Sequence, residues 1–278
     1  MMEACRLGSI SFFSDSASMR ILFLGDIVGK PGYTAVLQQA EPLRKQHRLD
    51  YVVANAENAS DGSGLMPRQF QRLMDSGVDG VTLGDHIYRR KEITAILEKS
   101  ARIVKPANYP GDATGKRWTV LRRDGSPPLG LISLLGRVYM RPVDCPFDAV
   151  DLALSEMDND VNHVLVDVHA EATSDKQVLG RYLDGKVTAV LGTHTHVPTA
   201  DGCVLPGGTA FQCDVGMSGP YKSIIGRDIA RVTKTTRTFE PCHFHVATAD
   251  VRLCGAIVES DTAGKATCIE RFELKCSP

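Results

Sequence analysis

Short apolar runs alternate with amphipathic stretches along the first 215 residues of this chain. Six runs are rich in Val, Ile and Leu and are bounded by Gly, Asp, Asn or His, a pattern that predicts buried strands over residues 21–24, 51–54, 80–83, 130–135, 163–168 and 187–191. The stretches between them carry apolar side chains at helical spacing: residues 34–47, 68–76, 92–97, 149–157 and 173–183. Such alternation predicts an α/β fold.

The last third of the chain has a different pattern. Residues 244–253, 255–260 and 266–274 tend to alternate apolar and polar positions, which predicts antiparallel strands with one face in solvent. His243 and His245 open the first of these segments and are interpreted as the face of an edge strand. His163 follows a polar stretch and is expected at the surface. The whole pattern favours an α/β sheet or sandwich with mixed strand directions.

Composition narrows the class of protein. The hydrophobic fraction of 43% and the charged fraction of 23% are ordinary for a globular protein with a sizeable core. The net charge of −1 offers no electrostatic argument for a nucleic-acid or membrane surface as a stable partner. No apolar run approaches the ~18 residues that a membrane span needs. The eight cysteines include no Cys-x-x-Cys pair, so we expect free thiols and a cytoplasmic protein.

The chain shows no repeat and no linker, so residues 19–278 are expected to form a single domain. Residues 1–18 carry Glu3 and Arg6 and lack the apolar run of a signal peptide. We interpret them as a disordered leader or a misassigned start, because Met19 directly precedes the first predicted strand.

Residues with metal-binding chemistry follow the predicted strands. In chain order they are Asp26, Glu57, Asn58, Asp85, His86, His169, His194 and His196. Ligands of open α/β sheets bind at the carboxyl ends of the strands, so these side chains are expected to share one crevice. A lone His-x-His or Gly-Asp is weak evidence, and the prediction depends on their coincidence at five strand ends.

Carboxylates, imidazoles and an amide oxygen suit Mn, Fe, Zn or Ni cations rather than a thiolate-bound metal. Asp26, Glu57 and Asp85 would repel one another if they were packed together without cations. Two cations ~3.5–4 Å apart would neutralise them and support displacement at phosphorus. Glu57 is the natural candidate for a bridging ligand.

Several segments of the chain resemble the calcineurin-like metallophosphoesterases, and more closely their bacterial YmdB-type branch. The matching segments are residues 20–29, 55–58, 106–108, 144–147, 169–174, 192–197 and 214–221. Gly25-Asp26-Ile27-Val28 stands where metallophosphoesterases in general have Asp-x-His, as it does in this branch. The resemblance runs from Met19 to about Leu274.

The resemblance implies a two-sheet sandwich flanked by helices, in four layers. It implies that one metal is held by Asp26, Glu57, Asn58 and His196, and the other by Glu57, Asp85, His169 and His194. His86 would be the general acid. The implied activity is phosphodiester hydrolysis through a metal-bridging hydroxide, with small 2′,3′-cyclic nucleotides as substrates. Iron or manganese is the expected metal pair, with zinc or magnesium as alternatives, and self-association is left open.

One position departs from the branch. Its Gly-Asn-His motif reads Gly84-Asp85-His86 here, which adds a negative charge to the site. The metal preference and the rate are therefore expected to differ. Asp85 is also the one feature that favours a metal-binding regulatory protein with weak catalysis. A phosphomonoesterase or a nuclease is a further alternative, although the lack of positive net charge argues against the nuclease.

Overall fold

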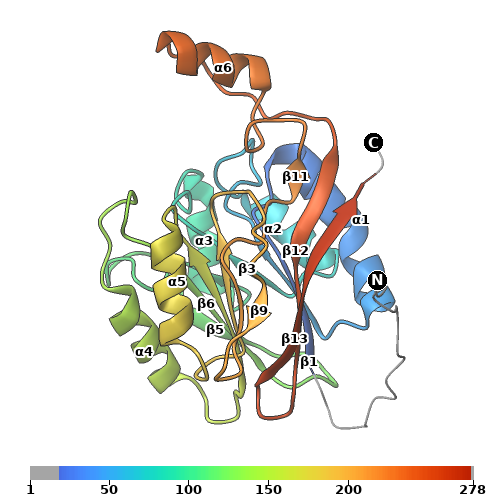
Figure 1. Ribbon diagram of the computed structural model, residues 1–278, viewed down its shortest axis with the longest axis vertical. Helices are drawn as coiled ribbons and strands as arrows, with labels where there is room; N and C mark the ends of the chain where they lie inside the picture. The colour runs from blue at the N-terminus through green and yellow to red at the C-terminus, as the bar shows by residue number, and fades with distance from the viewer. Residues whose placement is uncertain (1–18, 277–278) are drawn as a thin grey trace, which may run out of the picture.

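The computed structural model describes residues 19–276 and forms two β-sheets packed face to face, with helices on both outer faces (Figure 1). The first sheet has the strand order β11-β12-β1-β2-β3-β4, and β13 pairs with β12. Its strands are β1 (Met19–Leu24), β2 (Tyr51–Asn55), β3 (Gly80–Thr82), β4 (Ile103–Val104), β11 (Gly219–Pro220), β12 (Val251–Ser260) and β13 (Ala266–Lys275).

The second sheet has the order β5-β6-β7-β8-β10-β9. Its strands are β5 (Trp118–Leu121), β6 (Leu129–Leu135), β7 (His163–His169), β8 (Ala189–Thr193), β9 (Cys203–Val204) and β10 (Ala210–Gln212). Strands β1 to β4 run parallel, as do β6, β7, β8 and β10, whereas β12 is antiparallel to both β1 and β13. The predicted mixture of strand directions is confirmed.

Within residues 19–276, six α-helices and one short 3₁₀ helix connect the strands. They are α1 (Gly29–His47), α2 (Pro67–Asp75), η1 (Lys91–Ile93), α3 (Thr94–Lys99), α4 (Pro146–Glu156), α5 (Thr173–Tyr182) and α6 (Ile229–Thr238). Helix α1 starts five residues before the predicted segment and continues through Pro42, whose side chain is exposed. None of the helices within residues 19–276 has the length and apolarity needed to cross a bilayer.

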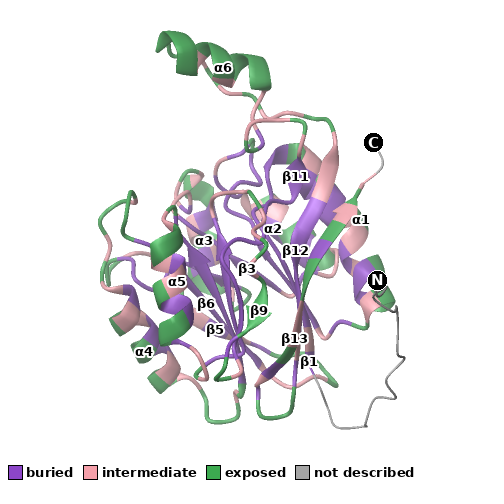
Figure 2. Ribbon diagram, viewed as in Figure 1, coloured by how far each residue is buried: buried purple, intermediate pink, exposed green. Residues whose placement is uncertain are grey.

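Three layers of apolar side chains separate the four layers of secondary structure. Because successive side chains of a strand point to opposite faces, β1 contributes to two of these layers. Ile21 and Phe23 pack between the sheets, whereas Leu22 and Leu24 pack beneath helices α1 to α3. A third cluster joins the outer face of the second sheet to α4 and α5. The central strands are accordingly buried and the outer helix faces exposed (Figure 2), and the four-layer α/β sandwich expected from the sequence is confirmed.

The C-terminal third differs from its prediction. Residues 244–250 form no strand, and residues 251–260 form one continuous strand, β12. His243 and His245 lie in exposed chain beyond α6, a helix that the apolar pattern did not predict because no face of it is buried. The surface prediction for His163 is wrong as well. It is only 2% exposed, and its Nδ1 lies 3.0 Å from Ser260 Oγ of the facing sheet.

Candidate metal centre

The eight side chains singled out in the sequence lie together at one edge of the sandwich. They end or follow β1, β2, β3, β7 and β8, and in chain order they are Asp26, Glu57, Asn58, Asp85, His86, His169, His194 and His196. The first three of these strands belong to one sheet and the last two to the other, so both sheets contribute to the same site.

Four of these residues form a compact group. One potential ligand atom from each of Glu57, Asp85, His169 and His194 lies within 4.8 Å of the corresponding atom of the other three. His169 Nε2 is 3.1 Å from Glu57 Oε1 and 3.4 Å from Asp85 Oδ1. His194 Nδ1 is 3.0 Å from His169 Nε2. The distances are those of side chains that converge on one small space, the arrangement that a divalent cation requires.

A second group shares Glu57 with the first. His196 Nε2 lies 3.8 Å from Asp26 Oδ1 and 3.2 Å from the Asn58 amide nitrogen, which in turn donates to Glu57 Oε1 at 3.3 Å. The Asn58 amide oxygen is 2.7 Å from His86 Nδ1. Asn58 would present its oxygen to a cation after rotation of the amide by about 180°, since the two ends of an amide have nearly the same shape.

The chemistry of the buried atoms fits cations. Asp26 Oδ1 and Asp85 Oδ1 are buried, and neither has a hydrogen-bond partner among the described residues. Unpaired buried carboxylate oxygens are costly, and a cation would satisfy them. Gly84 adds a steric constraint, because a Cβ there would lie 2.3 Å from both Glu57 Oε2 and His169 Nε2. The backbone therefore approaches the cluster as closely as only glycine permits.

Burial and the charges of neighbouring side chains shift the pKa values of the cluster residues. Burial raises the pKa of Asp26 to about 6, against the opposing effect of His196 and His169. Burial and the nearby His169 lower the pKa of His194 to about 4, so its imidazole is neutral at pH 7 and keeps a lone pair for a metal. Burial disfavours a proton on His169, but the nearby carboxylates of Glu57 and Asp85 raise its pKa well above the usual value.

A buried network orients His169. Thr193 Oγ donates to Asp167 Oδ1 at 2.7 Å, and therefore accepts from His169 Nδ1 at 2.8 Å. This tautomer leaves Nε2 of His169 free to face the cluster. Asp167 Oδ2 accepts in addition from Thr82 Oγ (2.6 Å) and from the Asn55 amide (3.0 Å), both of the facing sheet. The prediction from sequence assigned no role to Asp167, although it shares the strand face of His169 two residues later.

A second buried carboxylate holds the loop that carries the other two histidines. Asp214 Oδ2 accepts from the backbone N–H of Thr195 (3.1 Å), from its hydroxyl (2.7 Å) and from Lys176 Nζ (2.8 Å). His194 and His196, on either side of Thr195, have positive φ angles of 93° and 64°. Such backbone is strained for residues other than glycine, so the loop geometry depends on these contacts.

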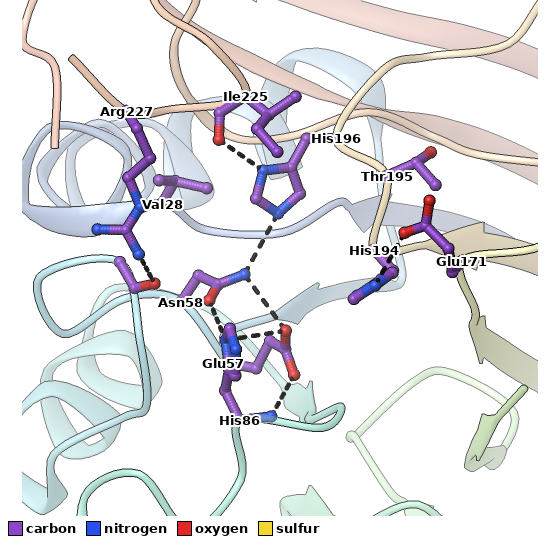
Figure 3. A pocket seen from close by; sticks show the side chains of 11 residues that line it. Val28, Glu57, Asn58, His86, Glu171, His194, Thr195, His196, Ile225 and Arg227 are labelled. Carbon is purple, nitrogen blue, oxygen red and sulfur yellow. Dashed lines mark hydrogen bonds and ion pairs between the residues drawn. The ribbon is translucent and has the colours of Figure 1, made fainter. Parts of the chain in front are cut away.

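The cluster opens into a pocket with a volume of about 380 Å³ (Figure 3). His86 lies in its wall with 27% of the side chain exposed, beside Asn58. Two lining residues did not emerge as site residues from the sequence. Glu171 Oε2 lies 3.3 Å from His194 Nε2. Arg227, which lies between β11 and α6, also lines the pocket. The pocket is within the usual size range of small-molecule sites.

A two-sheet α/β sandwich with a carboxylate–imidazole cluster at the strand ends defines a metallophosphoesterase. One family model within this class matches almost the whole chain. The family model described as "YmdB-like protein" matches residues 22–272, and the chain belongs to this family.

Two named relatives match this chain over most of their length. The chain is 41% identical over 255 residues to a 2′,3′-cyclic-nucleotide 2′-phosphodiesterase of Bacillus subtilis, covering 91% of this chain and 96% of the relative. It is 32% identical over 247 residues to a putative phosphatase/phosphodiesterase of Mycoplasma genitalium, covering 87% and 88%.

Two solved structures share the fold. A hypothetical protein of Thermus thermophilus superposes with a TM-score of 0.87 and 42% identity, covering 92% of this chain and 99% of that one. A structure titled as a novel phosphatase of Mycoplasma pneumoniae has a TM-score of 0.87 and 30% identity, covering 94% of each chain.

Proposed function

We propose that this protein is a metal-dependent phosphodiesterase with two cations in its site, acting on small phosphodiesters and foremost on 2′,3′-cyclic nucleotides. The observation that carries the proposal is the compact group of Glu57, Asp85, His169 and His194, which shares Glu57 with a second group around Asp26. The substrate class is taken from the Bacillus subtilis relative, whose name specifies it.

Seven residues of the site would bind the two cations, and His86 would donate a proton. Glu57, Asp85, His169 and His194 would hold one cation, and Asp26, Glu57, Asn58 and His196 the other. Bound cations would supply Lewis-acid chemistry, by neutralising the phosphoryl oxygens and making water more acidic. Iron or manganese is our choice of metal, because carboxylate, amide and imidazole ligands suit them and no thiolate is offered.

His86 is placed to serve as general acid. It lies at the wall of the pocket, where its Nδ1 is next to the side-chain amide of Asn58. Hydrolysis of a cyclic diester breaks the bond between phosphorus and one sugar oxygen, and water supplies the new oxygen on phosphorus. A proton from His86 would neutralise the departing sugar oxygen, and a phosphomonoester would remain.

The proposal is tested by metal-controlled hydrolysis. Protein stripped with a chelator is reloaded with Mn²⁺ or Fe²⁺ and assayed on 2′,3′-cyclic AMP, bis-p-nitrophenyl phosphate and p-nitrophenyl phosphate. We expect restored cleavage of both diesters by the wild type and none by Glu57→Gln, a nearly isosteric change at the shared ligand. Two bound metals without turnover of any substrate would instead establish the regulatory alternative.

The His86→Ala variant separates acid catalysis from metal binding. We expect its turnover to fall by roughly 10²–10⁴-fold, because the leaving oxygen would depart without a proton. The metal content, measured by elemental analysis, is expected to stay at the wild-type value. Loss of metal from this variant would instead make His86 a ligand.

A phosphomonoesterase is the second candidate, because the Mycoplasma pneumoniae structure is titled as a phosphatase. The same assay decides between the two, since a phosphatase would prefer the p-nitrophenyl monoester. We place the reaction in the cytoplasm. The seven cysteines within residues 19–276 are free thiols, which supports a reducing compartment.

A further inference from the structure

The pocket beside the metal centre has two ends of different chemical character. Val28, Ile225 and Arg227 lie at one end and Glu57 at the other, with the imidazole of His196 between them (Figure 3). The first end carries two aliphatic side chains and one cationic side chain, whereas the carboxylates belong to the metal end. A ligand that fills the pocket would therefore place an anionic group at the metal end and an apolar or aromatic group at the other.

Ile225 lies in a tight turn that does not favour isoleucine. Ile224 and Arg227 exchange two backbone hydrogen bonds of 2.9 Å. The two residues between them have positive φ angles, 44° for Ile225 and 95° for Gly226. A two-residue turn of this kind favours Asn-Gly, because asparagine and glycine tolerate a positive φ that strains a β-branched residue. Gly226 therefore suits the turn, whereas Ile225 makes it less stable.

Burial does not explain this isoleucine either. The side chain of Ile225 is 53% exposed, and it lines the pocket instead of packing in the core. Strained backbone persists only where the surrounding structure holds it, and such positions cluster at ligand-binding sites. Here the backbone is held on the pocket side, because the Ile225 carbonyl accepts from His196 Nδ1 at 3.0 Å. An exposed, strained isoleucine in a pocket wall is suited to contact an apolar face of a ligand.

Arg227 offers the pocket a flat surface. Its Nη1 donates to the carbonyl oxygens of Asp61 (3.0 Å) and Phe244 (3.2 Å). Its Nη2 donates to the Gly62 carbonyl, and a Cβ at Gly62 would lie 2.5 Å from Arg227 Cζ, so this glycine packs against the guanidinium. These contacts engage both terminal nitrogens and hold the group in place. A guanidinium plane held in this way can stack on a nucleobase.

We propose that Val28, Ile225 and the guanidinium plane of Arg227 bind the nucleobase of a cyclic nucleotide whose phosphate lies at the metal centre. The inference rests on the proposed function, which places the phosphate there. A cyclic nucleotide has one ribose between its phosphate and its base, and one imidazole, that of His196, separates the Ile225 carbonyl from the Asn58 amide. Stacking tolerates any base, because every base has a π-face. The site therefore favours nucleotides over diesters without a base.

Calorimetric titration of the Mn²⁺-loaded full-length chain tests the proposal without turnover. The ligands are 3′-deoxy-3′-(phosphonomethyl)adenosine and the methyl riboside that carries the same phosphonate and no base. Both have a C–P bond in place of the ester bond that a phosphoesterase breaks. We expect the adenine-bearing ligand to bind roughly ten-fold or more tightly, as stacking of one base provides. Equal affinities, or no binding of either ligand, overturn the proposal. A preference for adenine in protein that hydrolyses no substrate would refute the proposed catalysis and still support the base site.

The Ile225→Asn variant separates ligand binding from the stability of the turn. Asparagine suits the positive φ, so we expect a melting temperature at or above the wild-type value. The preference for the adenine-bearing ligand should nevertheless fall roughly five-fold or more, because the apolar wall is lost. The matched control is Ile229→Asn, since Ile229 is 46% exposed but lies in α6 outside the pocket. It should keep the wild-type preference. An unchanged preference in folded Ile225→Asn overturns the proposal.

The Arg227→Lys variant tests the guanidinium plane, because lysine keeps the charge and loses the flat surface. We expect the preference for the adenine-bearing ligand to fall in this variant too. Circular dichroism verifies that the variant is folded, and the Ile225→Asn result decides if it is not. An equal loss of affinity for both ligands would assign Arg227 to the phosphonate group and overturn its role in stacking.

Discussion

The imidazole of His194 has different surroundings at its two nitrogens. Nδ1 faces the cluster, 3.0 Å from His169 Nε2, and Nε2 faces the Glu171 carboxylate at 3.3 Å. A carboxylate at the outer nitrogen fixes the proton there and increases the basicity of the inner one. Glu171 is half-exposed, so solvent reduces its electrostatic effect but leaves its orienting effect in place.

Removal of this carboxylate should weaken metal binding without removing a ligand. We expect Glu171→Ala to lower the affinity for Mn²⁺ by roughly 10–100-fold, and Glu171→Gln by less, because the amide oxygen still accepts from Nε2. Titration against a fluorescent chelator measures the affinity independently of activity. Glu156→Gln, an exposed glutamate at the end of α4, is the control. Equal affinities for all four proteins would exclude the positioning role.

Asp85 tests how charge determines metal preference. The Asp85→Asn variant keeps an oxygen near His169 and His194 but removes one negative charge from the cluster. We expect it still to bind metal, with affinity for Mn²⁺ lower by roughly ten-fold and a changed ratio of Mn²⁺ to Zn²⁺ affinity, since neutral oxygens attract hard cations less. Calorimetric titration with each metal measures this. Asp112→Asn, at an exposed position, should match the wild type; a cluster variant that also matches it would contradict the prediction.

At the scale of elements, the important contact is the one between the sheets. Asp167 of β7 accepts from Thr193 in its own sheet and from Thr82 and Asn55 in the other. It therefore fixes the distance between β7 and strands β2 and β3, whose ends carry Glu57 and the Asp85 loop. Buried networks of this kind are effective only while every member is satisfied.

The Asp167→Asn variant puts an amide N–H where the carboxylate accepts hydrogen bonds. We expect a loss of roughly 1–3 kcal/mol in the free energy of unfolding, the usual cost of an unsatisfied buried group. The metal affinity should fall too, because His169 loses the chain of bonds that holds its tautomer. Urea unfolding and chelator titration measure the two effects. Wild-type values in both would show that the two sheets are positioned by apolar packing alone.

The elements that could be predicted from sequence are those whose apolar pattern reports burial. The strands that carry the site were predicted within a few residues, because β2 and β7 are buried on both faces and read as continuous apolar runs. Helix α6 has no buried face, so the spacing of its apolar residues did not predict it. Asp167 and Asp214 were missed as site residues for another reason: their partners lie tens of residues away in sequence and meet them only in the folded chain.

At the scale of the whole molecule, His163 is one of the groups that make stability depend on pH, and it lies outside the metal cluster. Burial lowers the pKa of His163 below its usual 6.5. The unfolded chain then binds a proton that the folded chain refuses, so the free energy of unfolding falls as the pH drops below about 6.5. We expect His163→Gln to show a smaller loss between pH 7.5 and 5.5 than the wild type in urea unfolding. The exposed His243→Gln should keep the wild-type slope, and an unchanged slope in His163→Gln would exclude this histidine as the cause.

The proposed ligands come from both sheets and from positions as far apart as Asp26 and His196. Cations bound among them would therefore act as cross-links between the two halves of the fold. Since a ligand that binds only the native state adds RT ln(1 + [L]/Kd) to its stability, metal supply would control how long the protein survives as well as how fast it works. A cell short of metal would lose this enzyme to proteolysis, and the remaining molecules would be those already loaded.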